Sequence, residues 1–279
     1  MSRIAYVNGR YLPHNQASVH IEDRGYQFGD GVYEVVLVLD KKLVDFDGHF
    51  RRLRRSLDEI CLVFDITETT IKQILKRLIR LNLINDGLIY MQVTRGVAER
   101  AHQFPKNVAP ALVVTAKSVI INADVGGKKA ITTVDERWER RDIKTINLLP
   151  NCIAKQKAIE NDAYEAIMVM EDGTISEGAS SNLWMVDGNK QIITRNASNV
   201  ILNGITKLAL TELADIHRYK VVEKPFTVDE AINAKELFIT SATAIVTPIT
   251  QLNNHVIADG KVGPISAALR SAYLERPFW

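Results

Sequence analysis

A single lysine, Lys144, lies among aliphatic residues in the segment 141–150, whose sequence is RDIKTINLLP. Burial among apolar side chains disfavours the ammonium form of a lysine, and the neutral amine is a nucleophile that can form a Schiff base with a carbonyl compound. Taken alone, the segment is more typical of a lysine whose ammonium group extends to solvent. A catalytic interpretation of Lys144 therefore depends on the motifs found elsewhere in the chain.

The composition is that of an ordinary globular protein. The chain has 279 residues, of which 46% are hydrophobic and 24% charged, with a net charge of +2. Such a length predicts one large or two medium domains. The small net charge gives no field that would attract nucleic acid or a membrane surface. Because no apolar run approaches a membrane span and the N-terminus lacks a signal-peptide core, we expect a cytoplasmic protein.

Cysteine and histidine show no metal-binding pattern. The two cysteines, Cys61 and Cys152, are too few and too far apart for a disulfide framework or a zinc site. Their helical, apolar surroundings predict that both are buried as small hydrophobic residues. The six histidines lack metal-ligand spacing. We therefore expect no metal, and a reducing compartment.

Hydrophobic patterning predicts an N-terminal domain of short strands and two helices. Asn8-Gly9 is a hairpin turn, and Asp47 is the expected N-cap of the first helix. The helices, 47–60 and 67–84, each have one apolar face. The expected strands of this half are 4–7, 10–12, 32–39, 43–46, 88–94 and 111–116.

The sequence Val125-Gly126-Gly127 interrupts the pattern, so we divide the chain into domains 1–122 and 123–279. Because strands and helices do not alternate regularly, we expect two α/β domains of mixed α+β type, with largely antiparallel or barrel-like sheets. In the second domain the expected strands are 130–134, 166–170, 182–186, 191–194, 221–222 and 237–240, and the expected helices are 151–161, 204–217 and 265–275.

A set of short motifs occurs in a fixed order along the chain: GDGVYE at 29–34, HFRRL at 49–53, the Lys144 segment, SEGASSN at 176–182 and LNGIT at 202–206. This set resembles the class IV, or fold type IV, pyridoxal-phosphate aminotransferases. That family contains D-amino acid aminotransferases, branched-chain aminotransferases and aminodeoxychorismate lyases. The resemblance covers nearly the whole chain. It implies a smaller N-terminal α/β domain and a larger C-terminal domain with a barrel-like sheet, which binds the cofactor and carries Lys144.

The resemblance implies several anchors for the phosphate of pyridoxal phosphate. The guanidinium of Arg52 offers a fixed fork of donors. The helix that begins at Ile205 and Thr206 presents free amides, which bind phosphate. Ser241 and Thr243 resemble a second phosphate-binding loop of the family.

The resemblance also implies contacts with the cofactor ring. Glu177 matches the carboxylate that faces the ring nitrogen, where a negative charge keeps the nitrogen protonated and the ring a better electron sink. Leu202 matches a residue that packs against the ring, and Arg137 one that approaches its phenolic oxygen. Lys144 is the catalytic residue, which holds the cofactor as a Schiff base.

The substrate carboxylate is expected to meet Arg100, His102 and the hydroxyl of Tyr33. The sequence Arg100-Ala101-His102 and the Asp142-Ile143-Lys144 context look like the D-amino acid aminotransferase branch. In that branch the loop reaches across from a neighbouring subunit, which implies a homodimer with shared active sites.

We therefore expect transamination of D-amino acids with a 2-oxo acid, of the D-alanine and 2-oxoglutarate type, in ping-pong fashion. Three alternatives remain open at this point. An aminodeoxychorismate lyase would use the same lysine to eliminate pyruvate, and a branched-chain L-aminotransferase would select the other enantiomer. The Arg100-Ala101-His102 loop disfavours both. A non-catalytic binding protein of the same fold is disfavoured by the intact Lys144, Glu177 and Arg52.

Overall fold

The computed structural model describes residues 3–276, whose internal contacts group them into two units. Unit 1 comprises 3–121 and the segment Ile143–Asn147, and unit 2 comprises Asn122–Asp142 and 148–276. We expected Lys144 in the C-terminal domain, whereas its segment clusters with unit 1. The chain therefore returns briefly to unit 1 before it completes unit 2.

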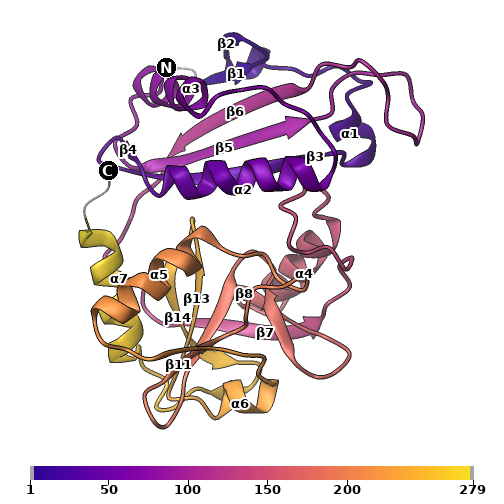
Figure 1. Ribbon diagram of the computed structural model, residues 1–279. Coiled ribbons are helices and arrows are strands. Elements are labelled where there is room, and N and C mark those ends of the chain that lie inside the picture. The colour runs from indigo at the N-terminus through magenta and orange to yellow at the C-terminus, as the bar shows by residue number, and fades with distance from the viewer. Residues whose placement is uncertain (1–2, 277–279) are drawn as a thin grey trace. The chain divides into compact units, whose positions relative to one another are not determined.

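Unit 1 is built on a six-stranded sheet in the order β2-β1-β6-β5-β3-β4, in which each neighbouring pair is antiparallel (Figure 1). Two long helices accompany the sheet, as the apolar spacing predicts. The elements of this unit are β1 (Ile4–Val7), β2 (Arg10–Pro13), the 3-10 helix η1 (His14–Gln16), α1 (Arg24–Phe28), β3 (Gly31–Leu39), β4 (Lys42–Leu43), α2 (Phe46–Glu59), α3 (Glu68–Leu81), β5 (Gly87–Thr94) and β6 (Ala111–Ser118).

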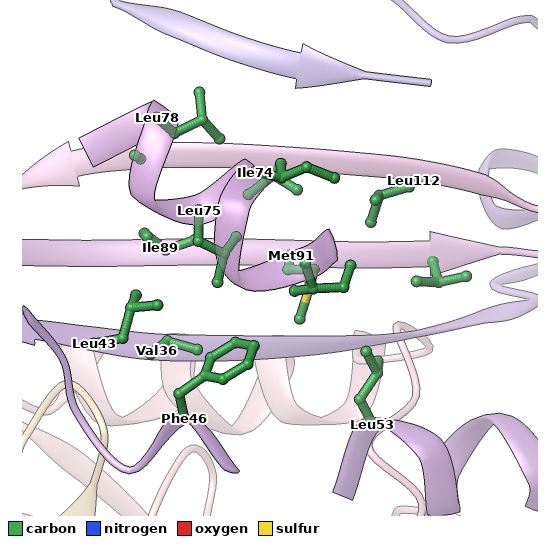
Figure 2. Packing of buried hydrophobic residues seen from close by; sticks show 14 of the residues in the cluster. Val36, Leu43, Phe46, Leu53, Ile74, Leu75, Leu78, Ile89, Met91 and Leu112 are labelled. Atoms are coloured by element: carbon green, nitrogen blue, oxygen red, sulfur yellow. The ribbon is translucent and has the colours of Figure 1, made fainter. Parts of the chain in front are cut away.

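The helices α2 and α3 share one hydrophobic core with the sheet (Figure 2). Successive side chains of a strand point to opposite faces, so Val32 and Val36 of β3 enter this core together. They meet Leu53 of α2 and Leu75 of α3 in the same cluster. Glu34 lies between the two valines in this alternation, and β3 therefore directs a carboxylate towards the helix-covered face.

Unit 2 is built on a nine-stranded sheet that curls into a half-barrel, in the order β12-β11-β10-β13-β14-β7-β8-β9, with β15 paired to β14. Three neighbouring pairs are parallel, β11 with β12, β14 with β7, and β7 with β8, so the sheet is mixed. Its elements are β7 (Lys128–Val134), α4 (Leu149–Glu160), β8 (Glu165–Val169), β9 (Ile175–Gly178), β10 (Asn182–Val186), β11 (Ile192–Thr194), α5 (Ile205–Ile216), β12 (Val221–Glu223), α6 (Val228–Ile232), β13 (Glu236–Ser241), β14 (Ile245–Leu252), β15 (His255–Val256) and α7 (Pro264–Glu275).

Three local predictions are wrong. The strand expected at 43–46 is limited to β4 (Lys42–Leu43), because α2 already begins at Phe46. Helix α2 follows an N-cap at Asp45, so Asp47 lies in the first turn instead of at the cap. Cys61 and Cys152 are exposed, not buried. Cys61 follows the C-terminal end of α2, and Cys152 lies on a face of α4 that its own unit leaves uncovered, because the buried residues of α4 are Ala154 and Ala158.

Within residues 3–276, no helix has the length and apolar character needed to cross a bilayer. The same part of the chain contains no group of three or more histidine, cysteine, aspartate or glutamate side chains arranged to hold a metal ion.

Candidate active site

The backbone of Lys144 is fixed to the start of β3. The N–H of Tyr33 donates to the carbonyl oxygen of Lys144 over 3.0 Å, and Thr145 forms an antiparallel bridge with Val32. The N–H of Lys144 donates to Ser56 Oγ of α2 over 3.3 Å. Because both polar groups of its backbone are bonded, Lys144 is held at a defined place beside the first residues of β3.

The side chain of Lys144 lies on an aromatic surface. Its Nζ is 4.2 Å from the centre of the Tyr33 ring, which stacks on Tyr90 at 5.5 Å. Burial, with a contribution from Tyr33, raises the pKa of Tyr90 to about 12, so this hydroxyl stays protonated. No carboxylate forms an ion pair with Lys144 among residues 3–276. The amine is thus available for covalent chemistry. Leu149, one of the aliphatic residues of the segment 141–150, is 68% exposed and does not enclose Lys144.

A buried cluster of charges lies between β3 and α2. Glu34 accepts hydrogen bonds from Arg52 Nε at 2.8 Å and Arg52 Nη2 at 2.8 Å, and its Oε2 is 2.7 Å from His49 Nδ1. His49 and Arg52 are three residues apart on α2 and therefore face the strand together. Glu34 fixes the plane of the Arg52 guanidinium, which is what a phosphate-binding arginine requires.

The cluster also shifts the titration of its members. Burial alone would raise the pKa of Glu34, but the charge of Arg52 and the hydrogen bonds from Arg52 and His49 outweigh burial and lower the pKa to about 2. Burial lowers the pKa of His49, and Glu34 offsets only part of this. Glu34 is therefore ionised across the physiological range, beside an imidazole that resists protonation.

Acid is expected to destabilise the protein through this cluster. Because the pKa of Glu34 in the folded protein lies below its ordinary value of 4.5, its carboxylate stabilises the fold above pH 4.5 and this stabilisation is lost as the pH falls towards 2. The loss amounts to about 3 kcal/mol. His49 acts in the same direction from its ordinary pKa of 6.5 downwards, since only the unfolded chain takes up its proton readily.

Glu34→Gln should remove the Glu34 part of this acid dependence and lower stability at neutral pH by about 3–5 kcal/mol, because the buried Arg52 loses its counter-charge. Urea unfolding of both proteins from pH 3 to pH 7 measures this. The matched control is Glu68→Gln, which breaks an exposed pair with Lys72 and should change stability by less than about 1 kcal/mol. An unchanged acid slope in Glu34→Gln would contradict the interpretation.

A buried arginine of α1 anchors the loop that contains Arg100 and His102 through hydrogen bonds to its backbone. Arg24 donates to the carbonyl oxygen of Ala101 over 2.6 Å and to that of His102 over 3.4 Å. The guanidinium of Arg100 lies 5.1 Å from the centre of the Phe28 ring, and the His102 ring packs edge-on against the same phenyl group at 5.8 Å. The structure thus brings the two predicted carboxylate-binding side chains to one aromatic platform.

In unit 2, the buried carboxylate of Glu177 is the centre of a hydrogen-bond network. Oε1 accepts from Arg137 Nη1 over 2.6 Å and from the N–H of Leu202 over 3.1 Å, and Oε2 accepts from Asn182 Nδ2 over 3.0 Å. Burial raises the pKa of Glu177, opposed by the charge and hydrogen bond of Arg137 and by the Leu202 N–H. Leu202 therefore helps to position Glu177 through its backbone, a role that the sequence did not predict.

Arg137 is engaged with carboxylates. Besides Glu177, it binds both oxygens of Asp135, at 2.9 Å from Nε and 2.8 Å from Nη2. Burial would lower the pKa of Arg137, but hydrogen bonds and charges of Asp135 and Glu177 outweigh burial and raise it. Asp135 also accepts from Ser176 Oγ over 2.6 Å and so links β9 to the same network. The arrangement places a permanent cation beside Glu177.

The N-terminus of α5 presents unpaired backbone amides. No side chain caps this helix at Gly204 among residues 3–276, and Ile205 and Thr206 are buried in its first turn. A Cβ at Gly204 would come within 2.1 Å of Asn182 Oδ1, so only glycine fits between this turn and the Glu177 network. Uncapped amides at a helix N-terminus form a ready site for a phosphate group.

A second group of donors follows β13. Ser241 Oγ and Thr243 Oγ1 lie 3.0 Å apart, and the N–H of Ala244 donates to Ser241 Oγ over 3.0 Å. Thr243 is exposed and Ser241 partly exposed, so their hydroxyls are open to a ligand.

These side chains fit pyridoxal phosphate. The cofactor needs an amine for its aldehyde, a carboxylate for its ring nitrogen and donors for its phosphate. Lys144 supplies an amine that pairs with no carboxylate in the described part of the chain, Glu177 a buried carboxylate, and the first turn of α5 free amides. In unit 1, Lys144 contacts Tyr33 and its backbone is bonded to Ser56 of α2, the helix that also carries Arg52; the Arg100 loop is a separate group. Unit 2 brings together Glu177, Arg137 and Leu202 beside Ile205 and Thr206, whereas Ser241 and Thr243 lie on a separate turn.

Sequence reasoning missed three residues that organise this chemistry. Glu34 had a visible signal, since it is the one acidic residue in an aliphatic run. Arg24 and Asp135 had none. Arg24 bonds carbonyls of a loop far along the chain, besides the carboxylate of Asp30, and Asp135 joins Arg137 to Ser176, which lies 41 residues later.

Comparison with known proteins identifies relatives along almost the whole chain. The family model described as "Amino-transferase class IV" matches residues 31–252. The D-alanine aminotransferase of Bacillus licheniformis is 42% identical over 95% of this chain and 94% of that protein. The D-alanine aminotransferase of Listeria innocua is 40% identical over 96% of this chain and 94% of that protein.

Solved structures match the fold closely at lower identity. The branched-chain amino acid aminotransferase of Escherichia coli has a TM-score of 0.90 at 20% identity and covers 98% of this chain and 93% of its own. The branched-chain aminotransferase of Thermoproteus uzoniensis has a TM-score of 0.87 at 22% identity, with coverages of 98% and 94%. These structural matches show that the fold is that of the fold type IV aminotransferases.

Proposed function

Because the chain belongs to the class IV aminotransferases, which use pyridoxal phosphate, we propose that it transfers the amino group of a D-amino acid to a 2-oxo acid. The observation that carries this proposal is the identity of about 40% with D-alanine aminotransferases over nearly the full length of both chains. The structural matches to branched-chain aminotransferases lie at 20% and 22% identity and bear on the fold alone.

Each residue has a distinct task in this proposal. Pyridoxal phosphate, when bound, supplies an electron sink that stabilises negative charge on the α-carbon of the amino acid. Lys144 attaches the cofactor covalently, and its freed amine then takes the α-proton and returns it as a general base and acid. Glu177 provides the negative charge for the ring nitrogen, and the charge and hydrogen bond of Arg137 oppose the rise in the pKa of this carboxyl that burial causes.

The phosphate is held by Arg52, by the amides of Ile205 and Thr206, and by the hydroxyls of Ser241 and Thr243. Arg52 suits this task because Glu34 fixes its guanidinium in one orientation. Leu202 packs against the ring and orients Glu177 through its N–H.

The substrate carboxylate is bound by Arg100 and His102, with the hydroxyl of Tyr33 as a further donor. A carboxylate fixed on one side of the cofactor decides which enantiomer presents its α-hydrogen to Lys144. The anchoring of this loop by Arg24 supports the assignment, because stereochemical discrimination requires a rigid partner.

We propose that the protein is a homodimer with shared active sites, in which the Arg100 loop serves the partner subunit. Exposed apolar side chains around α1 and this loop support an interface there: Ile21, Tyr26, Val97 and Phe104 are 75%, 76%, 42% and 54% exposed. The mass from light scattering tests the dimer. We also propose a cytoplasmic location, since Cys61 and Cys152 are exposed free thiols, which persist in a reducing compartment.

Arg100→Ala should weaken D-alanine binding by about 10- to 150-fold, because a charge-assisted hydrogen bond to the carboxylate is lost. It should also erode the preference for D- over L-alanine, while cofactor affinity stays unchanged. Single-turnover reactions over a range of D- and L-alanine concentrations measure both. The matched control is Lys106→Ala, which removes an exposed cation from the same segment. If Arg100→Ala keeps the wild-type affinity and enantiomer ratio, Arg100 does not bind the carboxylate, and the lyase alternative becomes the better assignment.

A further inference from the structure

Arg270 of α7 is a buried arginine whose hydrogen bonds all go to backbone carbonyls. Its Nη1 donates to the carbonyl oxygens of Ala244 at 3.1 Å and Val246 at 2.7 Å. Its Nε donates to Ala123 at 2.9 Å and its Nη2 to Asn122 at 2.6 Å. No acidic side chain pairs with Arg270 within residues 3–276, and the residue is 5% exposed. The four carbonyl oxygens offset the cost of burying this charge, and the guanidinium in turn fixes the backbone segments that carry them.

Two of these carbonyls flank a residue with an unfavourable backbone. Ile245 has φ of +58°, in the left-handed region that a β-branched side chain rarely adopts. A conformation of this kind persists only where its surroundings determine it. Arg270 Nη1 bonds the carbonyl before Ile245 and the one after it, and Thr247 Oγ1 bonds the Ala244 carbonyl at 2.8 Å as well. These bonds fix the turn in its strained form.

The strained turn determines where two hydroxyl groups lie. The turn comprises residues 241–246 and so contains Ser241 and Thr243, whose side-chain oxygens are 3.0 Å apart. The peptide that carries the N–H of Ala244 donates to Ser241 Oγ, so the orientation of the backbone at Ala244 sets the position of the Ser241 hydroxyl. Two hydrogen bonds, joined through the backbone of Ala244, thus connect Arg270 to the hydroxyl of Ser241.

We propose that Arg270 is a positioning residue that locks the turn 241–246 in the conformation in which Ser241 and Thr243 bind the cofactor phosphate. This inference rests on the proposed function, in that the two hydroxyls are taken to contact the phosphate. Preorganised donors bind an anion more tightly than mobile ones, because no ordering is required at the moment of binding. Loss of Arg270 should therefore weaken the recognition of the phosphate and leave the recognition of the pyridoxal ring unchanged.

The test compares pyridoxal phosphate with pyridoxal, which lacks the phosphate, as ligands of the apoenzyme. Arg270→Lys keeps the charge but cannot bridge the carbonyls with a planar fork. We expect its dissociation constant for pyridoxal phosphate to rise about tenfold and that for pyridoxal to change less than about twofold. Thr247→Val removes the second bond to the Ala244 carbonyl without burying an unpaired charge. It should raise the ratio of the dissociation constant for pyridoxal phosphate to that for pyridoxal, but by less than Arg270→Lys does.

The matched control is Glu236→Gln. Glu236 holds the N-terminal end of α7, accepting from the N–H of Ile265 at 2.8 Å and of Ser266 at 2.8 Å. This variant should lower the melting temperature and leave the ratio of the two dissociation constants at the wild-type value. If it changes the ratio as much as Arg270→Lys does, a general loosening of α7 explains the effect and the proposal is overturned.

The double variant Ser241→Ala, Thr243→Ala separates this inference from the proposed function. If it changes the ratio and neither Arg270→Lys nor Thr247→Val does, the hydroxyls bind phosphate but Arg270 does not position them. If the double variant leaves the ratio unchanged, the hydroxyls do not bind phosphate, and the positioning role of Arg270 fails with that assignment. A change in the double variant and in Arg270→Lys, but not in Glu236→Gln, supports the proposal.

Discussion

Lys144→Ala should abolish covalent attachment of the cofactor and lower turnover by at least about 10⁴-fold, the upper range for losing a general base, because the same amine also forms the covalent link. The geometry supports this assignment. Two backbone hydrogen bonds fix Lys144 beside β3, its Nζ lies over the Tyr33 ring, and no carboxylate of residues 3–276 forms an ion pair with it. A lysine engaged in an ion pair would first have to break that pair.

Borohydride reduction of the wild-type enzyme followed by peptide mapping is the direct check, and the pyridoxyl label should lie on Lys144. Lys157→Ala is the matched control, since this α4 lysine is exposed and paired with Glu136. Lys207 is the most serious competitor because it is 1% exposed, but its amine is bonded to Glu223. A label on Lys207, or on any lysine other than Lys144, would refute the assignment.

Glu177→Gln should retain the cofactor and lower turnover by about 10²- to 10³-fold, the range found when one preorganised electrostatic group is removed. A neutral amide cannot keep the ring nitrogen protonated, so the electron sink is weakened. The variant preserves the shape of the site, because glutamine can still accept from the Leu202 N–H through its oxygen.

Steady-state kinetics and the absorbance of the bound cofactor measure this effect together. Glu171→Gln is the control, because Glu171 is an exposed carboxylate only six positions earlier in the chain. Wild-type turnover in Glu177→Gln, with the cofactor bound, would mean that Glu177 does not face the ring nitrogen. Loss of the cofactor instead of turnover would make Glu177 an anchor and not an electronic partner.

The elements that could be predicted from the sequence are those with strong periodicity or turn chemistry. The Asn8-Gly9 hairpin, the helix after Thr67 and the helix after Gly204 all appear where the patterns place them. Strand β14 was missed because Pro248 interrupts its sequence and proline disfavours a strand interior. The strand forms nevertheless, with a register shift between Ile249 and Gln251 where it pairs with β7.

The side chains that organise the candidate site were harder to predict, since their partners come from distant parts of the chain. Arg24 bonds carbonyls of a loop 77 and 78 residues later, and Arg137 meets Glu177 across 40 residues. No local pattern encodes such contacts. The position of Lys144 depends likewise on pairing with Tyr33, far upstream, and this explains why its segment clusters with unit 1.

The central claim is that this class IV aminotransferase acts on D-amino acids, and one half-reaction tests it most directly. Purified enzyme loaded with pyridoxal phosphate is mixed in turn with D-alanine and L-alanine, and the cofactor absorbance is followed as it converts to the pyridoxamine form. We predict stoichiometric conversion by D-alanine, with L-alanine slower by roughly a hundredfold or more, as expected where the wrong enantiomer leaves the polar groups that bind the carboxylate unpaired. Conversion by L-alanine at the rate of D-alanine or faster, or no conversion by either, would contradict the claim.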